Sequence, residues 1–176
     1  MKIEIVKVGD LKCNCYLLDI DGSVLIIDPG NESDKIIDKI GDREVVGIII
    51  THYHFDHIGG IDDMVSKYHC NIYDRNNMNE GVNIIDNFMF DVIYTPGHKE
   101  DCITIYFKND NIMFVGDFIF KDSIGRCDLL GGDIVEMSKS LNKISNFDKN
   151  ILIYPGHGDS TTLGYEIENN FELYMY

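Results

Sequence analysis

The pattern of apolar and polar positions divides the first half of the chain into strands and helices. Four segments show the alternation or the continuous apolar run that is typical of strands: residues 2–8, 12–20, 23–28 and 45–50. Segment 33–40 instead places its isoleucines on one helical face, with Ser33 as a possible N-cap. Helical spacing after Gly59 predicts a second helix that ends near Tyr68.

The second half repeats this mixture after a polar loop at residues 74–80. Further strands are predicted at residues 88–94, 102–107, 112–115 and 151–154. Residues 133–147 have helical spacing, and Asp133 and Glu136 are spaced as a capping box. A last helix is predicted from about Tyr165. Strands and helices are thus mixed in each half of the chain, which predicts a layered α/β architecture. A length of 176 residues is typical of one domain, spanning 1–176.

The three prolines of the chain share one context. Pro29, Pro96 and Pro155 each follow a predicted strand and precede a glycine. Pro-Gly ends a strand sharply, because proline lacks the N–H that a ladder needs and glycine permits a turn. Two of these turns are followed at once by a histidine, His98 and His157. The pattern therefore predicts that both imidazoles lie at strand ends.

The densest chemical signal is the segment 52–57, in which three histidines and one aspartate fall within six residues. In an extended segment His52 and His54 point to the same side, while Asp56 and His57 follow where the chain turns into a helix. Imidazole and carboxylate are ligands that divalent zinc and iron prefer. The segment therefore predicts the start of two neighbouring metal sites. Asp117 ends a strand, and its two oxygens could bridge two ions.

Charge and cysteine content limit the partners. The chain has 30 acidic and 15 basic side chains, a net charge of −15, so we expect no nucleic acid and no anionic membrane surface as partner. We find no export signal and no apolar run near the ~20 residues of a spanning helix. The cysteines are odd in number and lack a C-x-x-C motif, which favours buried free thiols in a reducing cytoplasm. The oligomeric state stays open.

The order of these residues resembles the metal-site pattern of the metallo-β-lactamase-fold hydrolases. That pattern is His-x-His-x-Asp-His at 52–57, followed by a lone histidine, an aspartate and a last histidine, and Asp28 matches the family's structural aspartate. The resemblance implies a four-layer αββα sandwich with the metals at one edge of its two sheets. It implies a first metal held by His52, His54 and His98, and a second held by Asp56, His57 and His157, with Asp117 between them.

Finer motifs narrow the resemblance. Segments 116–120, 123–128, 131–133 and 155–158 are similar to the glyoxalase II (hydroxyacylglutathione hydrolase)-like branch. The implied activity is hydrolysis of a thioester or related ester by a hydroxide formed on two divalent ions, with Zn²⁺ expected and iron or manganese open. Asp56 would orient that hydroxide and take its proton. The chain is expected to be a short form, because it ends soon after His157 without the branch's C-terminal helical domain.

Two questions stay open in the sequence. Arg126 lies in one of these motifs, where it could bind a substrate carboxylate or could be a surface arginine paired with Asp122 or Asp128. The alternative functions are a lactonase or general esterase of the same superfamily and a persulfide dioxygenase. The dioxygenase would use one iron on His52, His98 and Asp117. The remaining ligand-type residues favour two metals.

Overall fold

The first half of the chain forms a five-stranded sheet in the order β1-β2-β3-β4-β5. The computed structural model describes residues 1–174. Its first three strands are antiparallel, and β3, β4 and β5 are parallel. The strands are β1 Lys2–Val8, β2 Cys13–Ile20, β3 Ser23–Ile27, β4 Glu44–Ile49 and β5 Ile72–Tyr73.

The second half forms a six-stranded sheet in the order β13-β12-β9-β8-β7-β6. All its pairs are antiparallel except β12 with β9, which run parallel. A separate small hairpin joins β10 Ile119–Phe120 to β11 Ser123–Ile124. The sheet strands are β6 Gly81–Ile85, β7 Phe88–Tyr94, β8 Ile103–Phe107, β9 Ile112–Gly116, β12 Leu152–Pro155 and β13 Thr161–Thr162.

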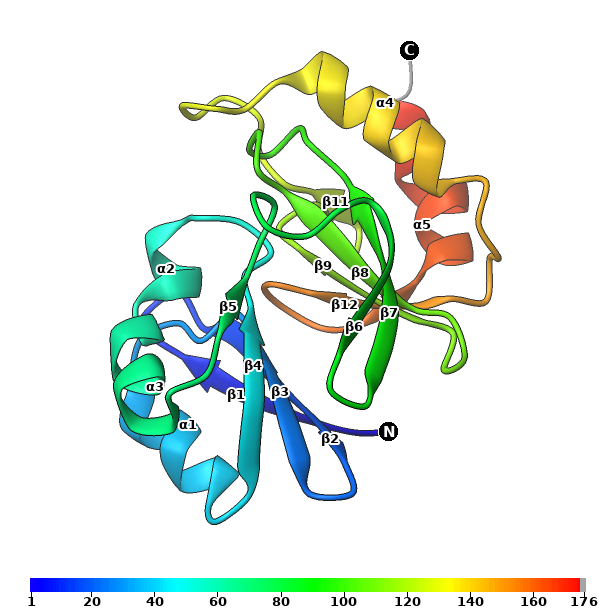
Figure 1. Ribbon diagram of the computed structural model, residues 1–176. Helices are drawn as coiled ribbons and strands as arrows, with labels where there is room; N and C mark the ends of the chain where they lie inside the picture. The colour runs from blue at the N-terminus through cyan, green and yellow to red at the C-terminus, as the bar shows by residue number, and fades with distance from the viewer. Residues whose placement is uncertain (175–176) are drawn as a thin grey trace.

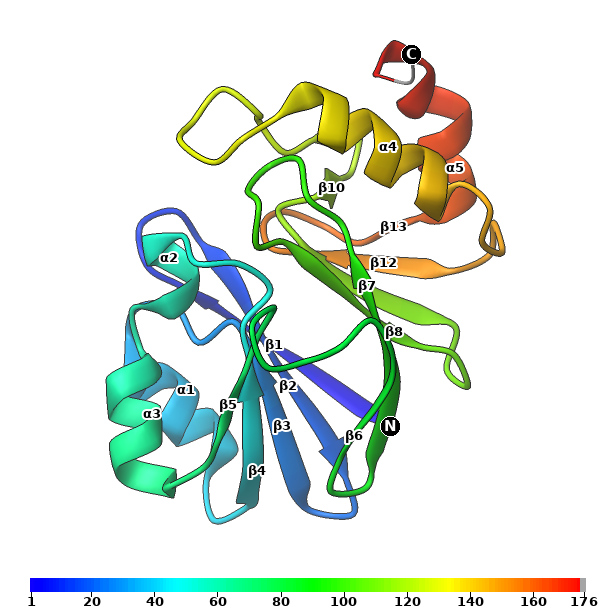
Figure 2. The ribbon, with the colours of Figure 1, turned by 45° about the horizontal axis from the view of Figure 1, so that its top comes forward.

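Helices cover the outer face of each sheet, which confirms the predicted four-layer αββα sandwich. Figure 1 shows the helices of the first half on the face of the first sheet that points away from the second sheet. Figure 2 shows α4 and α5 over the outer face of the second sheet. No helix in residues 1–174 is long and apolar enough to cross a membrane. The helices are α1 Ser33–Ile40, α2 Phe55–Ile58, α3 Ile61–Tyr68, α4 Ile134–Ile144, α5 Leu163–Asn169 and a 3-10 turn at Phe171–Leu173.

Alternate side chains of β2 contribute to two different hydrophobic cores. Tyr16 and Leu18 face the second sheet and belong to the core between the sheets. Cys13, Cys15 and Leu17 point the other way, into the core under α1 and α3. Because alternate side chains of a strand point to opposite faces, a strand apolar on both faces is buried between two layers.

Most predicted elements are confirmed, including the loop at residues 74–80. Several predictions of where the helices begin and end, and of which residues cap them, are wrong. Ser33 is not a cap: it is the first residue of α1, and its hydroxyl donates to Asp63 instead. Asp133 does cap α4 by accepting from two backbone N–H groups, while the Glu136 side chain pairs with Lys139, so the reciprocal half of the capping box is absent.

The ends of the last two helices also differ from the prediction. The helix expected at 133–147 ends at Ile144, and α5 begins at Leu163, two residues earlier than expected. Thr162 explains that earlier start, because its hydroxyl accepts from the Tyr165 N–H as an N-cap. The expectation of buried free thiols holds for three of the five cysteines; all five are free, but Cys70 and Cys127 are only partly buried.

Candidate metal centre

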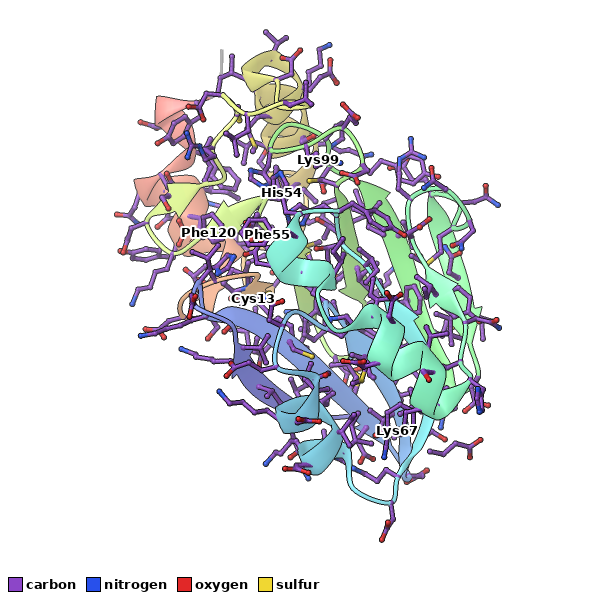
Figure 3. The ribbon with its side chains drawn as sticks, turned by 90° about the vertical axis from the view of Figure 1, so that its left-hand side faces the viewer. Cys13, His54, Phe55, Lys67, Lys99 and Phe120 are labelled. Carbon is purple, nitrogen blue, oxygen red and sulfur yellow. The ribbon has the colours of Figure 1, made fainter. Side chains whose placement is uncertain are left out.

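Five of the six histidines converge at one edge of the sandwich. His52 and His54 follow β4, His98 follows the Pro-Gly turn after β7, and His157 follows the one after β12. His57 lies on α2. Figure 3 shows His54 and Phe55 at this edge, where the two halves of the molecule meet. The strand ends therefore bring together side chains that are far apart in the sequence.

The first group consists of His52, His54 and His98, with Asp117 beside them. His54 Nδ1 lies 3.1 Å from His52 Nε2 and 2.8 Å from His98 Nε2. Asp117 Oδ2 lies 3.7 Å from His98 Nε2. One ligand atom from each of the four residues lies within 4.8 Å of the other three. Three nitrogens and one carboxylate oxygen thus face one point, which is enough to hold a divalent cation.

The second group consists of Asp56, His57 and His157. His157 Nε2 lies 3.0 Å from Asp56 Oδ2 and 3.6 Å from Asp117 Oδ2. His57 Nε2 lies 3.8 Å from Asp56 Oδ2 and 3.3 Å from Asp117 Oδ1. Asp117 therefore contacts both groups, and all seven residues predicted as ligands lie in one cluster.

Groups behind the cluster fix which imidazole nitrogen faces it. His98 Nδ1 donates to the Arg126 carbonyl at 2.7 Å, and His157 Nδ1 donates to the Leu11 carbonyl at 3.0 Å. His57 Nδ1 donates to Asp28 Oδ2 at 2.9 Å. Because a carbonyl or a carboxylate can only accept, Nδ1 of each ring carries a proton and Nε2 faces the cluster, where a neutral imidazole offers its lone pair to a metal.

Asp28 is a buried junction between the two groups. Besides holding His57, it accepts from the Thr51 N–H at 2.8 Å and from the Thr51 hydroxyl at 2.6 Å. The same hydroxyl lies 3.2 Å from His52 Nδ1. This network agrees with the structural role that the resemblance implies for Asp28.

Orphaned polar atoms show that the cluster fits a cation. His57 Nε2 and Asp117 Oδ1 are buried 3.3 Å apart and, in the described chain, neither makes a hydrogen bond of acceptable geometry. The backbone leaves no room for a larger residue: a Cβ on Gly156 would lie 2.3 Å from Asp117 Oδ1 and 2.6 Å from His57 Cε1. A divalent cation would satisfy both atoms, and imidazole and carboxylate are suitable donors for it.

The two groups differ in their proton affinity. Burial, together with the neighbouring histidines, lowers the pKa of His52 well below its ordinary value. Burial also acts to lower the pKa of His57, but Asp28 and Asp117 outweigh it and raise that pKa well above its ordinary value. Burial acts to raise the pKa of Asp56, but its hydrogen bond with His157 and the charges of His57 and His157 together lower it. In the second group the neighbouring carboxylates therefore favour the charged form of His57.

Sequence reasoning missed one residue of this cluster, Cys13. It is fully buried at the start of β2, and its sulfur joins ligand atoms of His57 and His157 within 4.8 Å of one another. Burial, partly opposed by His57, raises the pKa of its thiol to about 11. The sequence distance from the histidines concealed it, because a lone cysteine in an alternating strand indicates only core packing.

Arg126 is placed differently from the predicted ligands. Its guanidinium is exposed and pairs with Asp128 through two contacts, Nε–Oδ1 at 2.7 Å and Nη2–Oδ2 at 2.8 Å. An ion pair with Asp128 is one of the two predicted for a surface arginine at this position. The backbone carbonyl of Arg126, rather than its side chain, reaches the cluster through His98. Its binding of substrate stays a prediction.

Comparison with known proteins gives the family. The chain matches the model of the metallo-β-lactamase superfamily over residues 8–74 and 80–157, and it belongs to this superfamily. With the His/Asp cluster described above, this membership defines an enzyme of the metal-dependent hydrolase class.

The more specific similarities point in several directions. A relative from Haemophilus influenzae, named hydroxyacylglutathione hydrolase GloC, is 27% identical over 97% of this chain and 97% of its own. The solved structure of BLEG-1 B3 metallo-β-lactamase superposes with a TM-score of 0.92 at 29% identity, covering 97% of this chain and 99% of that one. TTHA1623 in a di-iron-bound form gives a TM-score of 0.87 at 27% identity, covering 95% and 98%.

Proposed function

We propose that the protein hydrolyses thioesters with two divalent metal ions, one held by His52, His54 and His98 and the other by Asp56, His57 and His157. The observation that carries this proposal is the position of Asp117, whose two oxygens contact both groups. A shared carboxylate fixes two cations close together, as binuclear hydrolysis requires. The name of the H. influenzae relative supports a thioester as substrate.

When bound, two such ions supply Lewis acidity and make a water molecule at the site more acidic. Asp56 is the residue that can take the proton from this water. Its pKa is lowered, so it is ionised at neutral pH, and its Oδ2 lies 3.0 Å from His157 Nε2 in the second group. The hydrogen bonds from His98 to Arg126 and from His57 to Asp28 keep both rings in one orientation throughout the reaction.

A single iron on His52, His98 and Asp117 is the alternative of a different class, a persulfide dioxygenase. That arrangement would leave His57 Nε2 buried without a metal, with Asp117 Oδ1 3.3 Å away and no hydrogen bond of acceptable geometry between them. Two metals satisfy this atom. The metal itself stays open between zinc, iron and manganese, since His/Asp sites accept all three. Zinc is our first expectation, and the di-iron form of TTHA1623 keeps iron in consideration.

The rim of the site bears on the substrate. Two cations close in sequence to His98 or in the motif at 123–128 are already paired: Lys99 with Asp101 at 2.9 Å, and Arg126 with Asp128 at 2.7 Å. Phe55, beside the histidines, is 69% solvent-exposed. Paired cations and a net charge of −15 support a small-molecule substrate with little negative charge and no nucleic acid or membrane partner. A neutral ester or lactone therefore stays an alternative to a glutathione thioester. The free thiols support a cytoplasmic location.

Substrate profiling tests the proposal. We would assay the metal-loaded protein on lactoylglutathione, on an uncharged acyl thioester, on a lactone and on a persulfide. We expect the two thioesters to be hydrolysed with the highest kcat/KM, and activity to be lost on chelation and restored by Zn²⁺. Faster lactone opening would favour the lactonase alternative, and oxygen consumption with the persulfide would overturn the hydrolase proposal.

A further inference from the structure

Cys13 occupies a special position on β2. The side chains of Cys13, Cys15 and Leu17 lie on the same face of the strand, and all three are fully buried. Cys15 and Leu17 continue into the apolar core under the helices, whereas Cys13 is the first residue of the strand and lies at the metal cluster. Figure 3 shows it below Phe55 and His54, on the same side of the molecule.

The sulfur of Cys13 belongs to a ligand group of its own. Cys13, His57 and His157 each offer one atom, and these three atoms lie within 4.8 Å of one another. Of the cysteines in residues 1–174, it is the only one found in such a group. Thiolate sulfur and imidazole nitrogen are frequent partners around zinc, with Zn–S near 2.3 Å and Zn–N near 2.0–2.1 Å.

A second observation points to a cation beside His57, a member of this group. His57 is fully buried, its Nδ1 is held by Asp28, and its Nε2 has no hydrogen-bond partner in the described chain. The hairpin loop before Cys13 also contributes, because the Leu11 carbonyl holds His157 Nδ1 and leaves Nε2 for a metal. Both imidazoles beside the thiol are therefore oriented as ligands, and one of them is unsatisfied.

We propose that Cys13 supplies a thiolate ligand to the second metal, beside His57 and His157. This inference rests on the two-metal centre of the proposed function. Binding forms a sulfur–metal bond, breaks the S–H bond and releases the proton to solvent, with no change of oxidation state. A soft sulfur donor makes the second position unlike the first, and it should favour zinc or iron over manganese there.

Cobalt substitution tests the assignment, because Co²⁺ bound by a thiolate has a sulfur-to-metal charge-transfer band in the near ultraviolet. We would load the apoprotein with two equivalents of Co²⁺, measure bound cobalt, and record spectra of the native protein, Cys13→Ser and Cys15→Ser. Cys15→Ser is the matched control, since it puts the same hydroxyl on the same strand and face. We expect the band in the native protein and in Cys15→Ser, and its loss in Cys13→Ser together with weaker binding of the second metal.

The outcomes separate this inference from the proposed function. Two bound cobalt ions without the band, or a band that persists in Cys13→Ser, would overturn the thiolate assignment and leave the two-metal centre intact. Uptake of fewer than two ions by the native protein would overturn both. If Cys13→Ser does not fold, X-ray absorption of the native zinc-loaded protein decides: a sulfur shell near 2.3 Å supports the assignment, and nitrogen and oxygen alone contradict it.

Discussion

The two ligand groups that meet at Asp117 differ in how their charges are balanced. The first group consists of imidazoles, and burial together with the neighbouring histidines lowers the pKa of His52 and of His54, which favours their neutral, metal-binding form. The second group adds Asp56 and is supported by Asp28, and the pKa of His57 is raised well above its ordinary value. The carboxylates around the second group therefore favour positive charge there, whereas in the first group His54 Nδ1 lies within hydrogen-bond distance of His52 Nε2 and His98 Nε2.

Asp117 joins these two unlike groups. It is the carboxylate that lies within reach of a histidine from the first group and of both histidines from the second. The first group would bind a cation with little internal rearrangement of charge. The second must exchange existing ion pairs for bonds to a metal, and its affinity depends on the groups that support it.

The largest effect is expected from Asp117→Ala, because it removes the shared ligand from both groups. We expect hydrolysis to fall to background, beyond the roughly 10–100-fold loss that is typical when a supporting group is removed. Metal content should fall below two ions per chain, and His52→Ala should also abolish hydrolysis and lower metal content. Element analysis and steady-state kinetics measure both. Exposed Asp159, near His157, provides a matched control as Asp159→Ala. Full activity in Asp117→Ala would end the two-metal account.

The second-largest effect is expected from Asp28→Asn, which changes the group that supports His57 in the second ligand group. The amide can no longer accept from His57 Nδ1 on the side where its NH₂ points, so the ring loses its fixed tautomer. We expect the second metal to bind roughly 10–100-fold more weakly, with a smaller change for the first. Competition with a chromophoric chelator measures the two affinities. Equal weakening of both sites would remove the distinction between the groups.

A smaller effect is expected from removal of the metals. A ligand at about a hundred times its Kd stabilises the folded protein by about 2.7 kcal/mol, and about 1 kcal/mol shifts the Tm of a domain of this size by roughly 2–4 °C. The chelated protein should therefore unfold on the order of 5–10 °C earlier and recover with Zn²⁺. Calorimetry with and without chelator measures this shift. An unchanged Tm would show that the cluster gains nothing from a cation.

The smallest effect is expected from Arg126→Ala. If the guanidinium receives a substrate carboxylate, KM should rise for an anionic thioester more than for a neutral ester. The exposed ion pair with Asp128 competes for the same donors, so the rise should be modest. Kinetics on the two substrates compare these effects directly. Equal changes in KM for the two substrates would show that Arg126 is a surface residue with no role in substrate binding.

The sequence predicted the layers and the clustering of the site because both depend on local signals. Pro-Gly turns mark the strand ends at His98 and His157. The segment 52–57 has four ligand-type side chains within six residues. Short edge strands gave no such signal: β6 has Val82 and Ile84 exposed at 70% and 67%, and β5 has two residues. Pairing with a neighbour, rather than local pattern, makes these segments strands.

Long-range contacts account for the rest of what sequence reasoning missed. Ser33 has the chemistry of a cap, but Asp63 on α3 accepts from its hydroxyl. Cys13 has the pattern of a core residue, and only the packing of β2 against α2 and the 157 loop brings it to the metal cluster. The ligand roles of the seven His and Asp residues stay predictions, while their convergence is a property of the fold.

Metal analysis of the protein, purified without chelator and then reconstituted, tests the central claim most directly. Element analysis should find two divalent ions per chain in the native protein and in Cys15→Ser, and hydrolysis should rise in proportion to the second ion bound. One ion per chain with full hydrolytic activity would contradict the account, because Asp56, His57 and His157 would then hold nothing that the reaction needs.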